Sequence, residues 1–133
     1  MAELSDEIRA LCEGANFAHL ATVRPDGAPH SVPVWIGLED GNIVFFTQPT
    51  SRKARHIERE PRVALSIVDR ANPYLMASVR GRVARTIEGD AALTIVDRIS
   101  QRYTGEDFPM RNGVVYVIEP ESAFTMTLPF KEK

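Results

Sequence analysis

The sequence predicts a mainly β protein of the α+β class: an antiparallel barrel or sandwich carrying about three short helices. Apolar residues alternate with polar ones over several short segments, which is the period of a half-buried strand. Gly, Pro, Asn and Asp occupy the gaps between these segments, as they do in hairpin turns. Segments with the strand period outnumber those with the helical period by roughly two to one, and the helical segments fall between strands.

The length of 133 residues suits one domain, so we expect a single domain over residues 1–133. Hydrophobic residues make up 44% of the chain and charged residues 26%, which excludes a disordered or fibrous protein. A domain of this size has little room for a deep pocket enclosed by one subunit. A large ligand would therefore favour a site shared by two copies.

The charge balance and the single cysteine narrow the choice of partners and compartment. The formal net charge is −2, so we expect no nucleic-acid partner and no anionic membrane surface. Cys12 is the only cysteine, which excludes an intrachain disulfide and favours a reducing compartment. The first ten residues lack the apolar run of a signal peptide, and no stretch approaches the roughly 18 apolar residues that span a bilayer. We expect a soluble, cytoplasmic protein.

The first half of the chain is predicted to form one helix and three strands. Leu4, Ile8 and Leu11 recur at helical spacing, and Gly14 follows where such a helix would end. The hydrophobic period then changes to two. Pro33 predicts an irregular or edge position for the second strand. The expected strands span residues 17–23, 31–38 and 43–48.

The second half of the chain is predicted to alternate between helices and strands. A short helix over residues 52–60 is stopped by Pro61. A longer helix opens near Gly89 and ends at Gly105, a residue type that suits a helix C-terminus. The expected strands span residues 62–69, 75–87, 114–118 and 123–128, of which the last two are separated by residues 119–122.

The charges of the short central helix are opposed to the helix dipole. Its first residues include Arg52, Lys53 and Arg55, and its last turn carries Glu58 and Glu60. The other two predicted helices open with acidic residues instead. Each misplaced charge costs roughly 0.3 kcal/mol or more, so this order invites a functional explanation.

A phosphate group would explain the charge order. A helix N-terminus offers unpaired N–H groups, and Thr50 and Ser51 add hydroxyls there. Arg52 and Lys53 add positive charge to the same anion site. The alternative is a solvated basic face whose cations pair with the acidic residues one turn later. The charge pattern alone leaves both open.

The segment around this helix resembles the flavin-phosphate segment of the pyridoxamine 5′-phosphate oxidase superfamily. In that superfamily an aromatic-Thr pair ends a strand, Ser-Arg-Lys-Ala opens a helix, and the helix ends near Pro-Arg-Val. The same order is present here in residues 45–63. Residues 17–29 and 79–83 are similar to the opening hairpin and the central strand of the same proteins, so the resemblance covers residues 4 to about 120.

The resemblance implies a fold, an assembly and a site. The fold would be an antiparallel split β-barrel, and the assembly a homodimer with one flavin-type cofactor at each of two sites across the subunit interface. Arg52 and Lys53 match the residues that hold the cofactor phosphate. Phe46 and Thr47 match the pair that lines its ribityl chain and ring, and Ser51 matches a nearby hydroxyl or backbone contact.

The residues of the strand that would face the cofactor ring differ from those of the oxidase itself. Val34, Trp35 and Ile36 lie on that strand. Ser31 and Ile36 stand where the oxidase has an Arg and a Lys, and Met76 stands where it has a ring-contacting Gln. The Arg and His that recognise pyridoxamine phosphate have no clear counterpart near the C-terminus. We therefore expect an activity other than oxidation of pyridoxamine phosphate.

The chain is more similar to the branch of the superfamily that uses the deazaflavin coenzyme F420. The residues that carry this similarity are 72–74, 79–83 and 102–105. The branch implies an oxidoreductase in which reduced deazaflavin passes a hydride to a small, conjugated substrate, with FMN as the alternative cofactor. Arg55 and Arg59 are candidates to contact the acidic tail of F420. An alternative of another class is a non-catalytic carrier or sensor of flavin, deazaflavin or haem.

No other residue pattern points to a catalytic or metal site. The three histidines have none of the short spacings of metal-ligand pairs, so we expect no metal. Neither a Ser-His-Asp nor a Cys-His arrangement is recognisable, and we assign no catalytic residue. Trp35 has an alternative role as a core or interface anchor. His30, in a hairpin, is expected at the surface.

Overall fold

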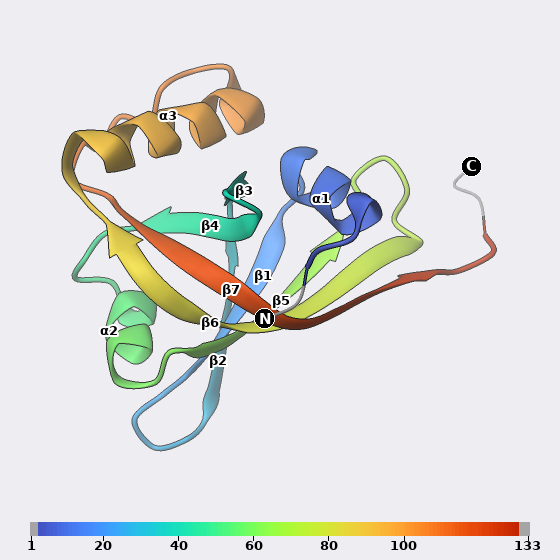
Figure 1. The fold of residues 1–133 in the computed structure, drawn as a ribbon, viewed down its shortest axis with the longest axis horizontal. Helices are drawn as coiled ribbons and strands as arrows, with labels where there is room; N and C mark the ends of the chain where they lie inside the picture. Colours follow the sequence, from blue (N-terminus) through green and yellow to red (C-terminus); the bar gives the residue numbers. More distant parts are fainter. Residues whose placement is uncertain (1–2, 131–133) are drawn as a thin grey trace.

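Residues 3–130, the part of the chain that the computed structural model describes, form three helices and seven strands (Figure 1). The ends of the expected domain, residues 1–2 and 131–133, lie outside the described residues. The predicted mainly β fold with three short helices is confirmed. The elements are α1 (Asp6–Glu13), β1 (Ala18–Val23), β2 (Pro29–Val34), β3 (Ile36–Glu39), β4 (Asn42–Thr47), α2 (Arg52–Arg59), β5 (Arg62–Val68), β6 (Leu75–Ile87), α3 (Gly89–Thr104) and β7 (Val114–Thr127).

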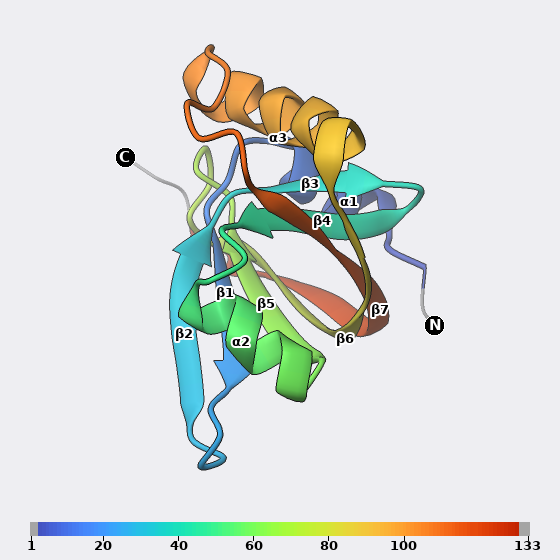
Figure 2. The ribbon, with the colours of Figure 1, turned by 90° about the vertical axis from the view of Figure 1, so that its left-hand side faces the viewer.

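The strands form one coiled antiparallel sheet in the order β2-β1-β5-β6-β7-β4-β3. Because the sheet coils, its two halves face each other as a split barrel (Figure 2). Helix α2 lies beside β1, β2 and β5, whereas α3 covers the other half, above β3 and β4 (Figures 1 and 2). Helices α2 and α3 therefore lie at different ends of the sheet.

Apolar side chains pack in two clusters, one inside the barrel and one between the sheet and α3. Strand β4 contributes to both clusters, because successive side chains of a strand point to opposite faces. Phe45 is fully buried in the barrel and stacks on Tyr116 of β7, with ring centroids 5.2 Å apart. Its neighbour Val44 is equally buried under α3, beside Ile99. The unbroken apolar run of this strand is explained by burial on both faces.

The strand predicted over residues 31–38 is two strands, separated at Trp35. Val34 of β2 pairs with Ala18 of β1, whereas Ile36 of β3 pairs with Phe45 of β4. The chain thus changes its pairing partner within two residues and leaves one half of the barrel for the other. The alternating pattern continues through the change, which is why the sequence predicted one strand.

The two strands predicted over residues 114–118 and 123–128 are one continuous strand, β7, which pairs along β6. The turn expected between them is a bulge instead, with a register shift between Arg80 and Gly81. Pro120 stands opposite Gly81. A Cβ atom on Gly81 would collide with the Glu119 carbonyl oxygen, so the close approach of the two backbones requires glycine.

Candidate functional site

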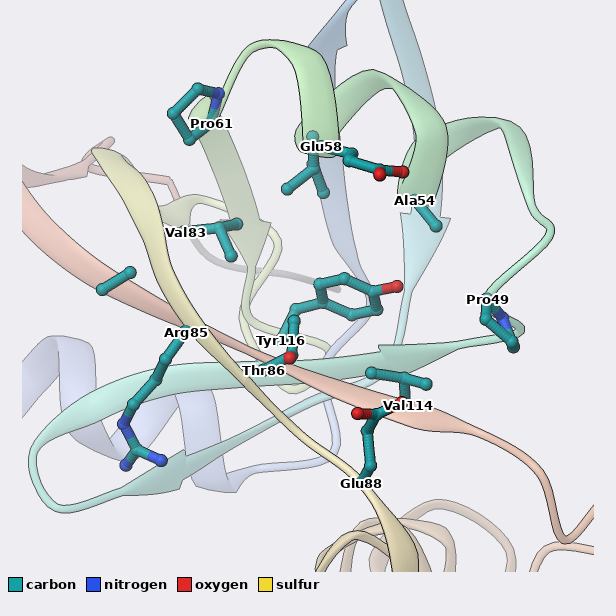
Figure 3. Close-up of a pocket in the computed structure, with 12 residues that line it drawn as sticks. Pro49, Ala54, Glu58, Pro61, Val83, Arg85, Thr86, Glu88, Val114 and Tyr116 are labelled. Atoms are coloured by element: carbon teal, nitrogen blue, oxygen red, sulfur yellow. The ribbon is translucent and has the colours of Figure 1, made fainter.

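Helix α2 lies between three pockets, and each of three faces of the helix contributes to one of them. The aromatic pocket, of about 200 Å³, is lined by Pro33, Val34, Trp35, Phe46, Lys53 and Phe108. The cationic pocket, of about 300 Å³, is lined by Arg24, Pro25, His30, Arg52, Arg55 and His56. The tyrosine pocket, of about 550 Å³, lies between α2 and the β6–β7 pair and contains Tyr116 (Figure 3).

Ser51 fixes the start of α2 and leaves one hydrogen-bond donor free. Its Oγ accepts from the Ala54 N–H at 3.2 Å, the bond of a helix N-cap. It also accepts from the Thr47 hydroxyl at 3.1 Å. A hydroxyl oxygen has two acceptor sites, so the Ser51 O–H remains available to donate. The first N–H groups of the helix point in the same direction without partners in the helix.

The aromatic pocket combines one cation with three aromatic rings. The ring centroids of Phe46 and Phe108 lie 5.0 Å apart, and Trp35 packs edge-on against both. Burial lowers the pKa of Lys53 below its ordinary value. Since its ammonium group is partly desolvated, an anion beside it would be attracted more strongly than at an exposed lysine.

Trp35 is held in place by a residue of α3. Its ring stacks on Tyr103 with centroids 5.0 Å apart and planes 8° from parallel. The Tyr103 hydroxyl accepts from the Ile36 N–H at 3.1 Å and donates to the Asn16 carbonyl oxygen. Burial raises the pKa of Tyr103, so the hydroxyl keeps the proton that it donates. The wall of the aromatic pocket is therefore anchored to the loop after α1, to β3 and to α3.

The cationic pocket contains a pair of histidines. The rings of His30 and His56 meet edge to face with centroids 5.0 Å apart. His56 is buried and shares a hydrogen bond of 2.9 Å with the Thr22 hydroxyl. Burial, followed by the positive charges around it, lowers the pKa of His56 and favours the neutral ring. His30 is only half-buried, but its Nδ1 atom is enclosed.

The structure brings most of the predicted cofactor residues together. Val34, Trp35, Phe46 and Lys53 share the aromatic pocket, and Thr47 and Ser51 are bonded to each other at the start of α2. Arg52 is exposed and faces the cationic pocket instead. Ile36 lies in the barrel core and lines none of the three pockets, because its side chain points to the opposite side of the extended chain from that of Trp35.

Two residues of the pockets carried no recognisable signal in the sequence. Phe108 reaches the aromatic pocket from the loop after α3, and no spacing relates it to Phe46. His56 pairs with Thr22 across 34 positions of the chain. Its place on a basic, polar helix gave no indication of burial. Such contacts depend on tertiary structure alone.

Residues 3–130 were also compared with the requirements of a metal site, a reactive thiol and a membrane-spanning helix. In that range no three His, Cys, Asp or Glu side chains lie close enough to hold a metal ion. The buried Cys12 has its pKa raised to about 12 by desolvation, which keeps the thiol protonated and unreactive. No helix of the same range is long and apolar enough to cross a membrane.

Known proteins match most of the chain. A family model described as pyridoxamine 5′-phosphate oxidase matches residues 4–127. The pyridoxine/pyridoxamine 5′-phosphate oxidase of Azorhizobium caulinodans is 36% identical over 101 residues, which are 74% of this chain and 47% of the relative. The protein of that name from Rubrobacter xylanophilus is 41% identical over 61 residues, 45% of this chain and 28% of the relative. The chain thus spans half or less of the length of these relatives.

Solved structures share the fold over nearly the whole chain. One named F420 reductase is 30% identical with a TM-score of 0.80, over 91% of this chain and 98% of that chain. A conserved hypothetical protein of Mycobacterium tuberculosis is 26% identical with a TM-score of 0.77, over 98% of this chain and 92% of that chain. With the match over residues 4–127, these likenesses bear out the resemblance seen in the sequence: the chain belongs to the pyridoxamine 5′-phosphate oxidase family.

Proposed function

We propose that this protein is an oxidoreductase that binds the deazaflavin coenzyme F420 and transfers a hydride from it to a small, conjugated substrate. The observation that carries the proposal is the aromatic pocket, where a half-buried Lys53 and three aromatic side chains meet beside the start of α2. The likeness to a structure named F420 reductase supports the choice of the deazaflavin. FMN is the second candidate, because it shares the ring shape and the phosphate position.

The groups at the start of α2 fit a phosphate. The free Ser51 O–H, the unpaired N–H groups of the first turn and the Lys53 ammonium are all donors. Arg52 adds a second cation from the exposed side of the helix. A helix N-terminus with such donors is a general anion site in proteins. No carboxylate lines the aromatic pocket to oppose the phosphate charge.

The aromatic pocket fits a planar ring better than it fits a polar substrate. Val34, Trp35, Phe46 and Phe108 present apolar surface, and Lys53 is the sole titratable side chain among the lining residues. When bound, a reduced deazaflavin supplies a hydride, which is chemistry that the side chains cannot perform. The protein would contribute position and the exclusion of water. No side chain is proposed as a proton donor.

The cationic pocket would suit the acidic tail of F420. Arg55 lines that pocket, and Arg59 lies one turn further along α2. The Arg59 guanidinium donates to the Arg24 carbonyl oxygen at 3.0 Å, which holds its charge near the pocket. FMN has no such tail. Charge reversal at Arg55 and Arg59 should therefore weaken the binding of F420 and leave that of FMN nearly unchanged.

We also propose that the site is completed by a second copy in a homodimer. Beyond residue 118, β7 pairs with β6 but not with β4, so its other edge is open. Phe124 and Met126 on this edge are 56% and 49% exposed. An open edge with large apolar side chains favours pairing with another chain. Light scattering should give the mass of a dimer, and Phe124→Asp with Met126→Lys should give a monomer; a wild-type monomer would overturn the assembly.

Calorimetric titration of the full chain with F420, FMN and FAD tests the cofactor. We expect F420 to bind most tightly, and Lys53→Ala to weaken it at least tenfold. Arg9→Ala, which removes an exposed cation from α1, is the matched control and should leave the affinity unchanged. Unchanged affinity in Lys53→Ala would overturn the phosphate site. If FMN binds more tightly than F420, the proposed cofactor is FMN and not the deazaflavin.

A second measurement separates an enzyme from a cofactor carrier. The bound cofactor is reduced without oxygen, and conjugated acceptors are added one at a time. For an enzyme, the absorption of the oxidised cofactor returns faster with one acceptor than it does without protein. If the spectrum of the reduced cofactor persists with every acceptor, the protein is a cofactor carrier and not an oxidoreductase.

A further inference from the structure

The tyrosine pocket on the far face of α2 plays no part in the proposed cofactor site. Part of its wall is formed by apolar side chains from three elements: Ala54 and Ile57 from α2, Val83 from β6, and Val114 from β7. Lys53 and Phe46 line the aromatic pocket and not this one. Its volume of about 550 Å³ falls within the range of pockets that hold small organic molecules.

Tyr116 places a hydroxyl without a partner among the described residues in this pocket. The residue is 7% exposed, and its ring stacks on Phe45 inside the barrel. Its hydroxyl points into the open space between α2 and β7 (Figure 3). Of the hydrogen bonds among residues 3–130, none involves the Tyr116 hydroxyl. The hydroxyl oxygen is accessible from the open space of the pocket, so a ligand that enters the pocket can bond to it.

Two carboxylates at the mouth of the pocket favour a positively charged ligand. Glu58 of α2 and Glu88 at the start of α3 line the pocket, and neither forms an ion pair with a described residue. Burial and then these two carboxylates raise the pKa of Tyr116, so its hydroxyl stays neutral. Arg85 lines the rim, but its guanidinium is directed away from Tyr116 (Figure 3). The potential at the hydroxyl is therefore negative.

We propose that the tyrosine pocket binds a small organic amine in its protonated form. The ammonium would donate to the Tyr116 oxygen and to Glu58 or Glu88, while the apolar body would pack against Ile57 and Val83. An anion of the same shape would meet two uncompensated carboxylates and no cation directed at it. This site requires neither Lys53 nor a bound cofactor, so it stands independently of the proposed function.

A pair of isosteric probes with opposite charges tests the proposal. Full-length protein is titrated with 2-phenylethylamine and with 3-phenylpropanoate, and backbone amide shifts are recorded. We expect saturable shifts at residues 54–58 and 114–116 with the amine, and none there with the acid. The proposal is overturned if the amine gives no saturable shift at these residues at millimolar concentrations. It is equally overturned if the acid binds as tightly as the amine.

Four variants assign the contacts. Tyr116→Phe keeps the ring and removes the hydroxyl, and the Glu58→Gln/Glu88→Gln double variant keeps both shapes and removes the charge. We expect each to raise the dissociation constant of the amine, the double variant at least tenfold. Glu106→Gln, an exposed carboxylate outside the pocket, should change nothing. Lys53→Ala should also leave amine binding intact, so failure of the cofactor site and failure of this site are distinguishable. An unchanged dissociation constant in the double variant would exclude the charge-selective pocket.

Discussion

Helices α2 and α3 lie against the same sheet but differ in length, charge order and burial. Helix α3 has 16 residues, with Asp90 in its first turn, Arg102 in its last turn and a left-handed Gly105 at its C-terminus. Helix α2 has 8 residues and no acidic residue in its first turn. Its C-terminal turn carries Arg59 as well as Glu58, so the unfavourable charge order is clearest at the N-terminus.

The difference separates a helix that holds the fold from a helix that presents a site. The buried side of α3 covers one of the two apolar clusters. The exposed first turn of α2 carries Arg52, which forms no ion pair with a described residue. The charges of α3 follow the helix dipole at both ends, whereas those of α2 oppose it where the cofactor phosphate is proposed. Local departures of this kind are expected at functional sites.

Truncation of the buried side of α3 should have the largest effect on stability. Ile99 is 1% exposed and packs beside Val44, so Ile99→Ala should lower the free energy of unfolding by about 2–5 kcal/mol. Urea denaturation followed by circular dichroism measures this loss. Thr94→Ala, on the exposed side of the same helix, should change it by less than about 1 kcal/mol. Equal losses in the two variants would contradict the structural role of α3.

Loss of the charge on Lys53 should affect binding and leave stability nearly unchanged. The ammonium must be protonated to pair with a phosphate, and burial sets its pKa below the ordinary 10.5. Cofactor affinity should therefore fall as the pH rises through a value below 10.5, by up to about 3 kcal/mol in total. Titrations between about pH 7 and pH 10 measure this fall. In Lys53→Arg, the cofactor affinity should not fall over this pH range, because the arginine keeps its charge. If the affinity of the wild type does not change with pH in this range, Lys53 does not contact the phosphate.

Removal of the Ser51 hydroxyl should have an intermediate effect on both properties. Ser51→Ala loses the N-cap bond to Ala54 and the bond from Thr47, so unfolding should become easier by about 1 kcal/mol. Cofactor affinity should fall as well, because the variant lacks the free O–H. Thr94→Ala removes an exposed hydroxyl from α3, outside the three pockets, and is the control for both measurements. A thermal unfolding curve that is unchanged in Ser51→Ala would show that the cap is dispensable.

Charge reversal at the two helix starts should have the smallest and most diagnostic effect on stability. Arg52→Glu places a favourable charge at the start of α2, so the cofactor-free protein should gain roughly 0.3–1 kcal/mol while cofactor binding weakens. Asp90→Lys on α3 is the mirror experiment and should lose a similar amount. Denaturation at low ionic strength measures both. A loss of stability in Arg52→Glu would mean that the arginine serves the fold.

Most of the fold was predictable because its signals are local. The helix that begins after Ser51 and the one that ends at Gly105 follow from capping residues next to them in the sequence. The division at Trp35 was not predictable, because it arises from a change of pairing partner on distant strands. The continuity of β7 through Pro120 likewise depends on Gly81, far away in the chain.

The residues of the candidate site likewise fall into those that local sequence predicts and those that only the tertiary structure brings together. Lys53 and Ser51 belong to one short segment whose residue order is recognisable, so they were predictable. Phe108 and Tyr103 approach Trp35 only after α3 has folded over the sheet. Ile36 was predicted at the site because its segment resembles the strand that faces the cofactor ring, and its side chain lies in the barrel core.

Trp35 gives this protein a natural optical signal. It is the sole tryptophan of the chain, and it lies in the wall of the aromatic pocket, stacked on Tyr103. Indole emits at wavelengths that flavins and deazaflavins absorb, so a cofactor in that pocket would quench the emission by energy transfer. Departure of α3 would expose the same ring to water and shift its emission to the red. One fluorophore can thus report cofactor occupancy and the integrity of the scaffold without any label.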